Sequence, residues 1–365
     1  MSDSDDHDWN SMPTWCWAAP LVAGALVAAL FAQVASPTNG FVFAVAIALL
    51  GATVFAAVHH AEVLAVRIGE PFGSILLALA ITALEVGLII SVMATGAAGS
   101  DTVARDTVYS VAMIVLNGIV GVCLVAGAAR HYEQEFRVQS AASILSVIAT
   151  LAVIALILPN FTVTTPGPSY APGQLLFVSA VSLGLYILFV FVQTVRHRGD
   201  YIMGDAVHHG EKPGARSTML SAILLVVSLI VVIALAKKLS PIVEAAVLRA
   251  GLPQAIVGVV IAIVVLLPEG VTALKAARHN RLQTSLNASL GSALASIGLT
   301  IPIVGAASVF LGQKLTLGLG PESMVLLILT LFVSTLTFAT GRTTVLQGAV
   351  HLVIFGVFVF LSAVP

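Results

Sequence analysis

Two acidic residues interrupt long apolar stretches at corresponding places in the two halves of the sequence. Glu85 lies within ILLALAITALEVGLIISVM, and Glu269 lies within IVGVVIAIVVLLPEGVTALKAA. A charge at the centre of a bilayer costs at least about 2.5–3.5 kcal/mol, so such residues are usually retained for function. The alternative for each is a neutral, hydrogen-bonded structural glutamate. We expect the two carboxylates to bind cations or protons together.

Hydroxyl groups lie at spacings that could complete this site. Thr82 precedes Glu85 by one helical turn, and Ser110 and Ser292 follow the two glutamates by 25 and 23 residues. We expect these three hydroxyls to be further metal ligands beside the glutamates.

Other polar groups in the same stretches are weaker candidates. Asn117, Ser296 and Thr300 fit hydrogen bonds between helices better than ligand roles. Pro268 precedes Glu269 in mid-helix, where it lacks an N–H and should free the carbonyl near Val264. Free carbonyls inside a membrane are tolerated where they line a cavity, so Pro268 and Asn117 are possible accessory members of the site.

Such a set of groups suits exchange of a cation for protons. Hard cations such as Ca²⁺ take six to eight oxygen ligands, and two carboxylates offer up to four. Without the cation, two like charges would face each other in a low dielectric, so protons would bind in its place. Competition between metal and protons for one pair of carboxylates is what antiport requires. We therefore expect no cofactor other than the transported ions.

The composition excludes a soluble protein. The chain has 365 residues, of which 59% are hydrophobic and 9% are charged, whereas soluble domains carry roughly 25% charged residues. The net charge of −1 gives no indication of nucleic-acid binding. About 20 apolar residues span a bilayer as a helix. Eleven stretches meet this length: 15–35, 40–66, 71–97, 103–129, 139–158, 172–195, 217–236, 253–277, 284–311, 322–340 and 344–363.

The order of these stretches predicts an all-α integral membrane protein with one extra helix and two inverted five-helix repeats. An odd number of helices in each repeat forces the two repeats into opposite orientations, as in many secondary transporters. The expected parts are an acidic tail (1–14), a first helix (15–36), an N-terminal repeat (37–196), a His-containing loop (197–216) and a C-terminal repeat (217–365).

The basic residues predict the orientation of the helices, because Lys and Arg favour the cytoplasmic side. With the N-terminus inside, eleven of the sixteen basic residues face the cytoplasm, and Arg105, Lys237, Lys238, Arg249 and Lys314 lie outside. The acidic start lacks the basic region of a secretory signal. We expect a multi-pass protein with a cytoplasmic N-terminus and a C-terminus on the periplasmic or extracellular side.

Several polar residues outside the two glutamate helices have a structural and a functional interpretation. Glu62 and Glu70 flank a turn, where they could cap a helix or give cations and protons access to the site. His208 and His209 in the long loop fit a solvated segment, although paired histidines can also bind metal. His351, inside the last apolar stretch, is interpreted as a packed polar residue.

Two segments carry a family resemblance. HHAEVLAVRIGEPFGSILLALAITALEVGLI at 59–89 and LLPEGVTALKAARHNRLQTSLNASLGSALASIGLTIPIV at 266–304 resemble the two signatures of the Ca²⁺/cation antiporter (CaCA) superfamily. RDTVYSVAMIVLNG, ATGRTTVLQGAVHL and the HHGEKP loop are similar to its bacterial ChaA-type, H⁺-coupled branch. The resemblance implies a Ca²⁺/H⁺ antiporter of the bacterial inner membrane, with Na⁺ or K⁺ as further substrates, and it implies that Glu85 and Glu269 are the central residues.

The chain departs from the superfamily pattern at three positions near the site. Related exchangers place amide side chains where this sequence has Thr82, Leu266 and Ala295, so fewer side-chain oxygens are available to a cation.

Other classes of membrane protein remain as alternatives. A monovalent cation/H⁺ antiporter without calcium transport would share most of these features, and a cation channel would conduct without proton coupling. An intramembrane enzyme is disfavoured because there is no H-E-x-x-H motif. The expected partners are inorganic cations, protons and the lipid bilayer, with no nucleic acid, and the sequence does not indicate an oligomeric state.

Overall fold

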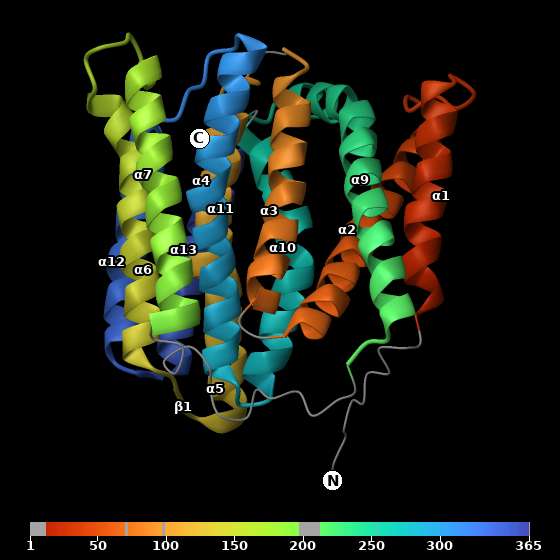
Figure 1. The fold of residues 1–365 in the computed structure, drawn as a ribbon. Helices are drawn as coiled ribbons and strands as arrows, with labels where there is room; N and C mark the ends of the chain where they lie inside the picture. The colour runs from red at the N-terminus through yellow and green to blue at the C-terminus, as the bar shows by residue number, and fades with distance from the viewer. Residues whose placement is uncertain (1–11, 70–71, 97–98, 197–211, 254, 365) are drawn as a thin grey trace. The chain divides into compact units, whose positions relative to one another are not determined.

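The computed structural model describes residues 12–69, 72–96, 99–196, 212–253 and 255–364. Its described part contains eleven helical spans long and apolar enough to cross a membrane, which confirms the expected number. Helices suit this role because each satisfies its own backbone hydrogen bonds without water. Figure 1 shows the helices in chain order from red to blue.

The first half of the chain supplies six of these spans. Three of them contain wide π-turns, and one of these three ends in a 3-10 turn. Their elements are α1 (Thr14–Phe31), α2 (Gly40–Ile68), α3 (Phe72–Met93), α4 (Val103–Met113), η1 (Ile114–Ile119), α5 (Val120–His131), α6 (Val138–Ala152), η2 (Val153–Ile157), η3 (Leu158–Phe161), α7 (Pro172–Phe191) and η4 (Val192–Arg196).

The second half supplies five spans. They are α9 (Ala215–Arg249), α10 (Ala255–Arg278), α11 (Leu282–Leu311), α12 (Pro321–Ala339) and α13 (Val345–Ala363). Across the described residues the strands are limited to β1 (Gln134–Glu135) and β2 (Arg342–Thr343), which pair antiparallel.

The seventh span corrects one expected boundary. The apolar stretch stops at residue 236, but α9 continues to Arg249 through Lys237, Lys238 and Pro241. Lysine is a good helix former, so a helix can outlast its apolar stretch. The Lys238 ammonium lies 4.0 Å from the centre of the Phe31 ring, which is a cation–π contact.

The chain forms two compact units. One comprises Met1–Leu84 with Ile202–Ile242, and the other comprises Glu85–Tyr201 with Val243–Pro365. In the first unit, Leu30 of α1, Ala46 of α2, and Leu235 and Leu239 of α9 form an apolar core. The buried His60 of α2 links the same three helices, because its Nε2 contacts the Cys16 carbonyl at 3.1 Å and its Nδ1 contacts the Ser221 hydroxyl at 3.3 Å.

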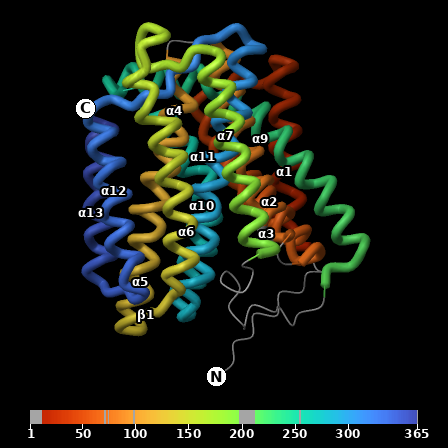
Figure 2. The backbone as a smooth tube through the Cα atoms, turned by 60° about the vertical axis from the view of Figure 1, so that its left-hand side comes forward, coloured from red at the N-terminus to blue at the C-terminus, as the bar shows by residue number. Residues whose placement is uncertain are grey.

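In the second unit, α11 and the continuous span α4–η1–α5 are the most buried helices. α11 packs against α4, α6, α7 and α10, while α5 packs against α10 and α13. Figure 2 shows α12 and α13 side by side at one edge of this group. These two central spans carry five of the polar residues that the sequence singled out: Ser110, Asn117, Ser292, Ser296 and Thr300.

A polar cluster fastens three turns at one end of the second unit. The Gln134 amide donates to the Ala277 carbonyl and to Asn280, and β1 pairs with β2 beside it. The Gln283 carbonyl group accepts the Arg137 backbone N–H at 2.6 Å. The turns after α5, α10 and α12 are therefore fixed to one another.

Candidate functional site

Glu85 lies on α3 and is bound by a hydroxyl from α11. Its side chain is only 2% exposed, and its Oε1 accepts a hydrogen bond of 2.6 Å from Ser296 Oγ. Ser296 is itself buried, at 2% exposure. The carboxyl group is thus held by a specific donor on a second helix.

Glu269 lies on α10 and is approached by Ser292, which lies on α11 like Ser296. The Ser292 side chain lies beside the carboxyl group of Glu269, while Glu269 Oε2 is buried and has no hydrogen-bond partner among the described residues. A buried, unpartnered carboxylate oxygen is costly, so it demands a proton or a cation. A Cβ atom at the neighbouring Gly270 would lie 3.4 Å from Ile119 of η1, an ordinary van der Waals contact, so η1 packs beside this part of α10.

Both glutamates are therefore reached from adjacent turns of α11. Ser292 and Ser296 are four residues apart, and this spacing places two side chains on one helix face with about 5–6 Å between their Cβ atoms. The two carboxyl groups also interact electrostatically. Two carboxyl groups and two hydroxyl groups thus lie along adjacent turns of α11, and two ionised carboxylates so placed would repel each other unless a cation or a proton neutralised them.

The sequence predicted Ser292 but not Ser296 as a site residue. Ser296 forms the interhelical hydrogen bond that the sequence predicts for it, and this bond ends on the carboxyl group of Glu85. The signal that could have identified it is the i, i+4 repeat with Ser292.

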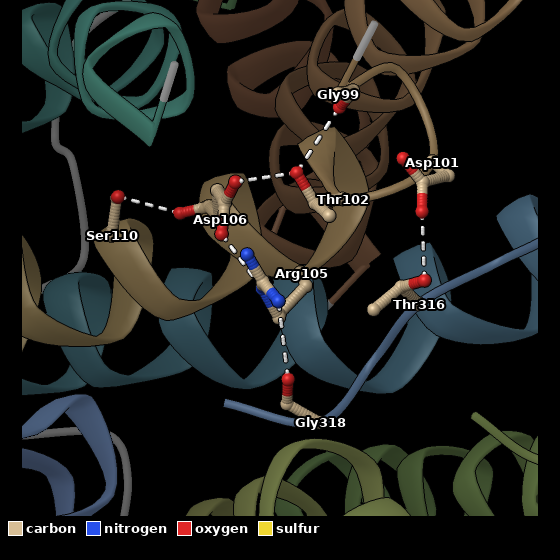
Figure 3. A network of polar contacts seen from close by, with 8 residues as sticks. All are labelled: Gly99, Asp101, Thr102, Arg105, Asp106, Ser110, Thr316 and Gly318. Atoms are coloured by element: carbon tan, nitrogen blue, oxygen red, sulfur yellow. Dashed lines mark hydrogen bonds and ion pairs between the residues drawn. The ribbon is translucent and has the colours of Figure 1, made fainter. Parts of the chain in front are cut away.

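The other predicted hydroxyls are placed differently. Thr82 is buried on α3 one turn before Glu85. Ser110 is also buried, but its hydroxyl donates to the backbone carbonyl of Asp106 at 2.5 Å, not to a glutamate (Figure 3).

Asp106 anchors a polar network at the start of α4. Its carboxylate accepts from Arg105 Nε at 2.8 Å and from Thr102 Oγ1 at 2.9 Å. Arg105 also donates to the Gly318 carbonyl, and Thr316 donates to Asp101 at 2.8 Å. Figure 3 shows that these contacts tie the start of α4 to the segment between α11 and α12.

Asn117 is bonded away from the two glutamates. Its Nδ2 donates to Thr330 Oγ1 of α12 at 2.9 Å, and its Oδ1 lies 3.1 Å from Nδ1 of His351 on α13. The amide is therefore engaged with the outer helices of the unit, and the structure does not bring it to the carboxyl pair.

The remaining candidates are accounted for as follows. Pro268 lies inside α10, which continues unbroken through it, and its carbonyl accepts from Thr272 Oγ1 at 3.2 Å. Glu62 is half-buried on α2. Glu70, His208 and His209 lie outside the described residues.

A family model described as "Sodium/calcium exchanger protein" matches residues 39–195 and 220–364. Each matched stretch holds five of the membrane-length spans, and α1 precedes both. This agrees with one extra helix followed by two five-helix halves.

Sequence relatives extend over nearly the whole chain. The "Putative ionic transporter y4hA" of Sinorhizobium fredii is 52% identical over 361 residues, which is 97% of each chain. The "Sodium-potassium/proton antiporter ChaA" of Escherichia coli is 38% identical over 321 residues, which is 86% of each chain.

Solved structures share the fold. Native YfkE superposes with a TM-score of 0.75 at 17% identity, covering 96% of this chain and all of that one. The H⁺/Ca²⁺ exchanger CAX superposes with a TM-score of 0.69 at 15% identity, covering 95% and 89%. The chain is a membrane transporter, not an enzyme, and it belongs to the sodium/calcium exchanger family within the Ca²⁺/cation antiporter superfamily.

Proposed function

We propose that this chain is a secondary antiporter that exchanges Ca²⁺ for H⁺ by alternating access, with Glu85 and Glu269 as the shared binding site. The observation that carries the proposal is the pair of carboxyl groups contacted by Ser292 and Ser296, in which Glu269 Oε2 is left unpartnered. A cation would neutralise both carboxylates, and protons would replace it on release. Since one set of oxygens serves both, metal and protons exclude each other.

Specific observations favour a second candidate, which is exchange of Na⁺ or K⁺ for H⁺ without calcium. The Escherichia coli relative described as a sodium-potassium/proton antiporter is 38% identical, whereas the solved Ca²⁺/H⁺ exchangers share the fold at 15–17% identity. Leu266 and Ala295 supply no side-chain oxygen, so the chain offers fewer side-chain ligands to Ca²⁺, which takes six to eight oxygens.

The setting in the membrane belongs to the same proposal. A multi-pass protein of the bacterial inner membrane, with its N-terminus in the cytoplasm and its C-terminus outside, would satisfy the bias of basic residues. In this orientation Glu62 lies on the cytoplasmic side, where it would draw cations toward the protein. No cofactor is required, because the transported ions are the only ligands that the chemistry uses.

The test is transport in proteoliposomes with an acidic interior and a pH-sensitive dye. Addition of Ca²⁺, Na⁺ or K⁺ outside should release protons from the wild type. Glu85→Gln and Glu269→Gln should each abolish the response, because neither amide can bind the cation and release a proton. Glu322→Gln is the matched control, since Glu322 is an exposed acid at the start of α12.

The outcomes separate the candidates. A response to Ca²⁺ that both glutamate variants lose supports Ca²⁺/H⁺ exchange, and a response to Na⁺ or K⁺ alone supports the second candidate. Cation flux without any movement of protons would indicate a channel and contradict both. Retention of full exchange by either glutamine variant would refute the assigned site.

A further inference from the structure

The span that carries Ser110 contains a wide turn near its middle. Between α4 and α5, the six residues of η1 adopt π-helical geometry. The Val120 N–H contacts the carbonyls of Val115 and Asn117, whereas a regular α-helix would pair it with Leu116. Such a turn absorbs one extra residue in a helix and is frequent at functional sites.

The helix that contains η1 is closely packed on both sides of the wide turn. On the α4 side, a Cβ atom at Gly258 of α10 would lie 2.9 Å from the backbone of Asp106. On the α5 side, a Cβ atom at Gly348 of α13 would lie 2.8 Å from the Val125 nitrogen. One residue turns an α-helix by about 100°, so closing the wide turn would rotate one of these two contact faces away from its partner.

A buried histidine holds the wide turn. His351 of α13 is fully buried, and its Nδ1 lies 3.1 Å from Asn117 Oδ1. The imidazole ring also lies beside the Leu116 carbonyl, with which Val120 does not pair. The Asn117 oxygen can only accept a hydrogen bond, so Nδ1 carries the proton. Thr337 then donates to Nε2, over a distance of 3.1 Å.

Asn117 is fixed at its other end too. Its amide nitrogen donates to Thr330 of α12, so Asn117 is hydrogen-bonded to both α12 and α13. Every polar group of this cluster is buried, and loss of one partner would leave an unsatisfied polar group inside the membrane.

We infer that His351 is a positioning residue, which holds η1 open through Asn117 and Leu116 and thereby keeps the face of α4 that carries Asp106 and Ser110 against α10 and α11. The effect on transport rests on the proposed function, since α10 and α11 carry Glu269, Ser292 and Ser296. His351 itself touches no transported ion in this inference.

The first test compares His351→Ala with a suppressor. The alanine variant should raise the cation concentration for half-maximal exchange by roughly tenfold or more, because small misplacements of binding groups have large effects. Deletion of Val115 in the same variant should restore most of the affinity, since a helix one residue shorter keeps both packing faces without a wide turn. His279→Ala, at an exposed histidine, is the control and should leave transport unchanged.

A second measurement does not depend on transport. Asp101→Cys and Thr316→Cys, made with Cys16→Ala and Cys123→Ala, place two thiols where a hydrogen bond of 2.8 Å now joins the side chains. With a protease site inserted within residues 197–211, a short bis-methanethiosulfonate reagent should keep the two cleaved halves together on a denaturing gel.

The cross-link decides the inference even if no ion is moved. Its yield should fall severalfold in the His351→Ala variant and return when Val115 is also deleted. An unchanged yield in the His351→Ala variant would refute the inference, and so would a loss that the deletion fails to restore. Absence of exchange in the wild type, with the cross-link behaving as expected, would instead refute the proposed function.

Discussion

Ser296 Oγ donates a hydrogen bond of 2.6 Å to Oε1 of Glu85, joining α11 to α3 at a buried carboxyl group. One turn earlier on α11, Ser292 contacts Glu269 of α10. A single helix thus serves both acidic residues, and small movements of α11 would alter both at once.

This relationship predicts the effect of removing either serine. Ser296→Ala or Ser292→Ala should weaken apparent cation affinity roughly tenfold, because hydrogen bonds to charged groups contribute about 1.5–3 kcal/mol. Ser289→Ala is the control, since its hydroxyl bonds the Ser285 carbonyl of its own helix. The dependence of the exchange rate on cation concentration in proteoliposomes measures these affinities. Equal affinities in all three variants would contradict the prediction.

The contact between α10 and α4 predicts that Gly258 tolerates no side chain. In Gly258→Ala, the added Cβ would meet the backbone of Asp106 at 2.9 Å, and backbone cannot move aside as a flexible side chain can. We expect a loss of stability of about 1–3 kcal/mol, typical of overpacking. The thermal midpoint in detergent measures it.

Gly184→Ala is the matched control for that variant. A Cβ at Gly184 of α7 would have nothing within 4 Å, and alanine is the better helix former. Its thermal midpoint should stay the same or rise slightly, and a drop equal to that of Gly258→Ala would argue against a specific clash.

The ion pair at the start of α4 predicts unequal effects of two similar substitutions. Asp106→Asn removes the charge that faces Arg105, whose side chain is only 20% exposed. We expect a cost of about 1–3 kcal/mol, less than for a fully buried pair. Asp101→Asn should cost less, since an amide oxygen can still accept from Thr316. Thermal unfolding of the two variants compares them directly, and equal losses would contradict the role of the ion pair.

Tyr170 predicts an alkaline loss of stability. This residue precedes α7, and burial raises the pKa of its hydroxyl from 10.0 to about 12. The folded state therefore holds the proton more tightly than the unfolded state, so the stabilisation is complete below about pH 10 and is lost as pH rises from 10 to about 12. The thermal midpoint should fall over this range less steeply in Tyr170→Phe than in the wild type.

The same variant should be less stable at neutral pH. In the wild type, the Tyr170 hydroxyl donates to the Ile154 carbonyl at 2.5 Å, and losing this bond should cost about 1 kcal/mol. Tyr132→Phe, at a side chain that is 91% exposed, should follow the wild type at every pH. A wild-type profile in Tyr170→Phe would contradict the prediction.

The number and kind of helices could be predicted from the sequence because each span is a local property. About 20 apolar residues must be helical in a bilayer whatever their neighbours. The same local rule failed at α9, where the helix continues past the apolar stretch to Arg249. It also could not distinguish the wide turn at Ile114–Ile119 from a regular α-helix, because partners on α12 and α13 hold that turn.

The sequence by itself determined that Glu85 and Glu269 are the exceptional residues, since the cost of a membrane carboxylate depends only on its own surroundings. Only the tertiary structure decided which hydroxyls accompany them. The Ser110 hydroxyl donates to a backbone carbonyl of its own helix, whereas the Ser296 hydroxyl of α11 donates to Glu85 on α3. A hydroxyl can satisfy itself locally or across helices, and the choice depends on which helix face lies opposite, which periodicity within one helix does not encode.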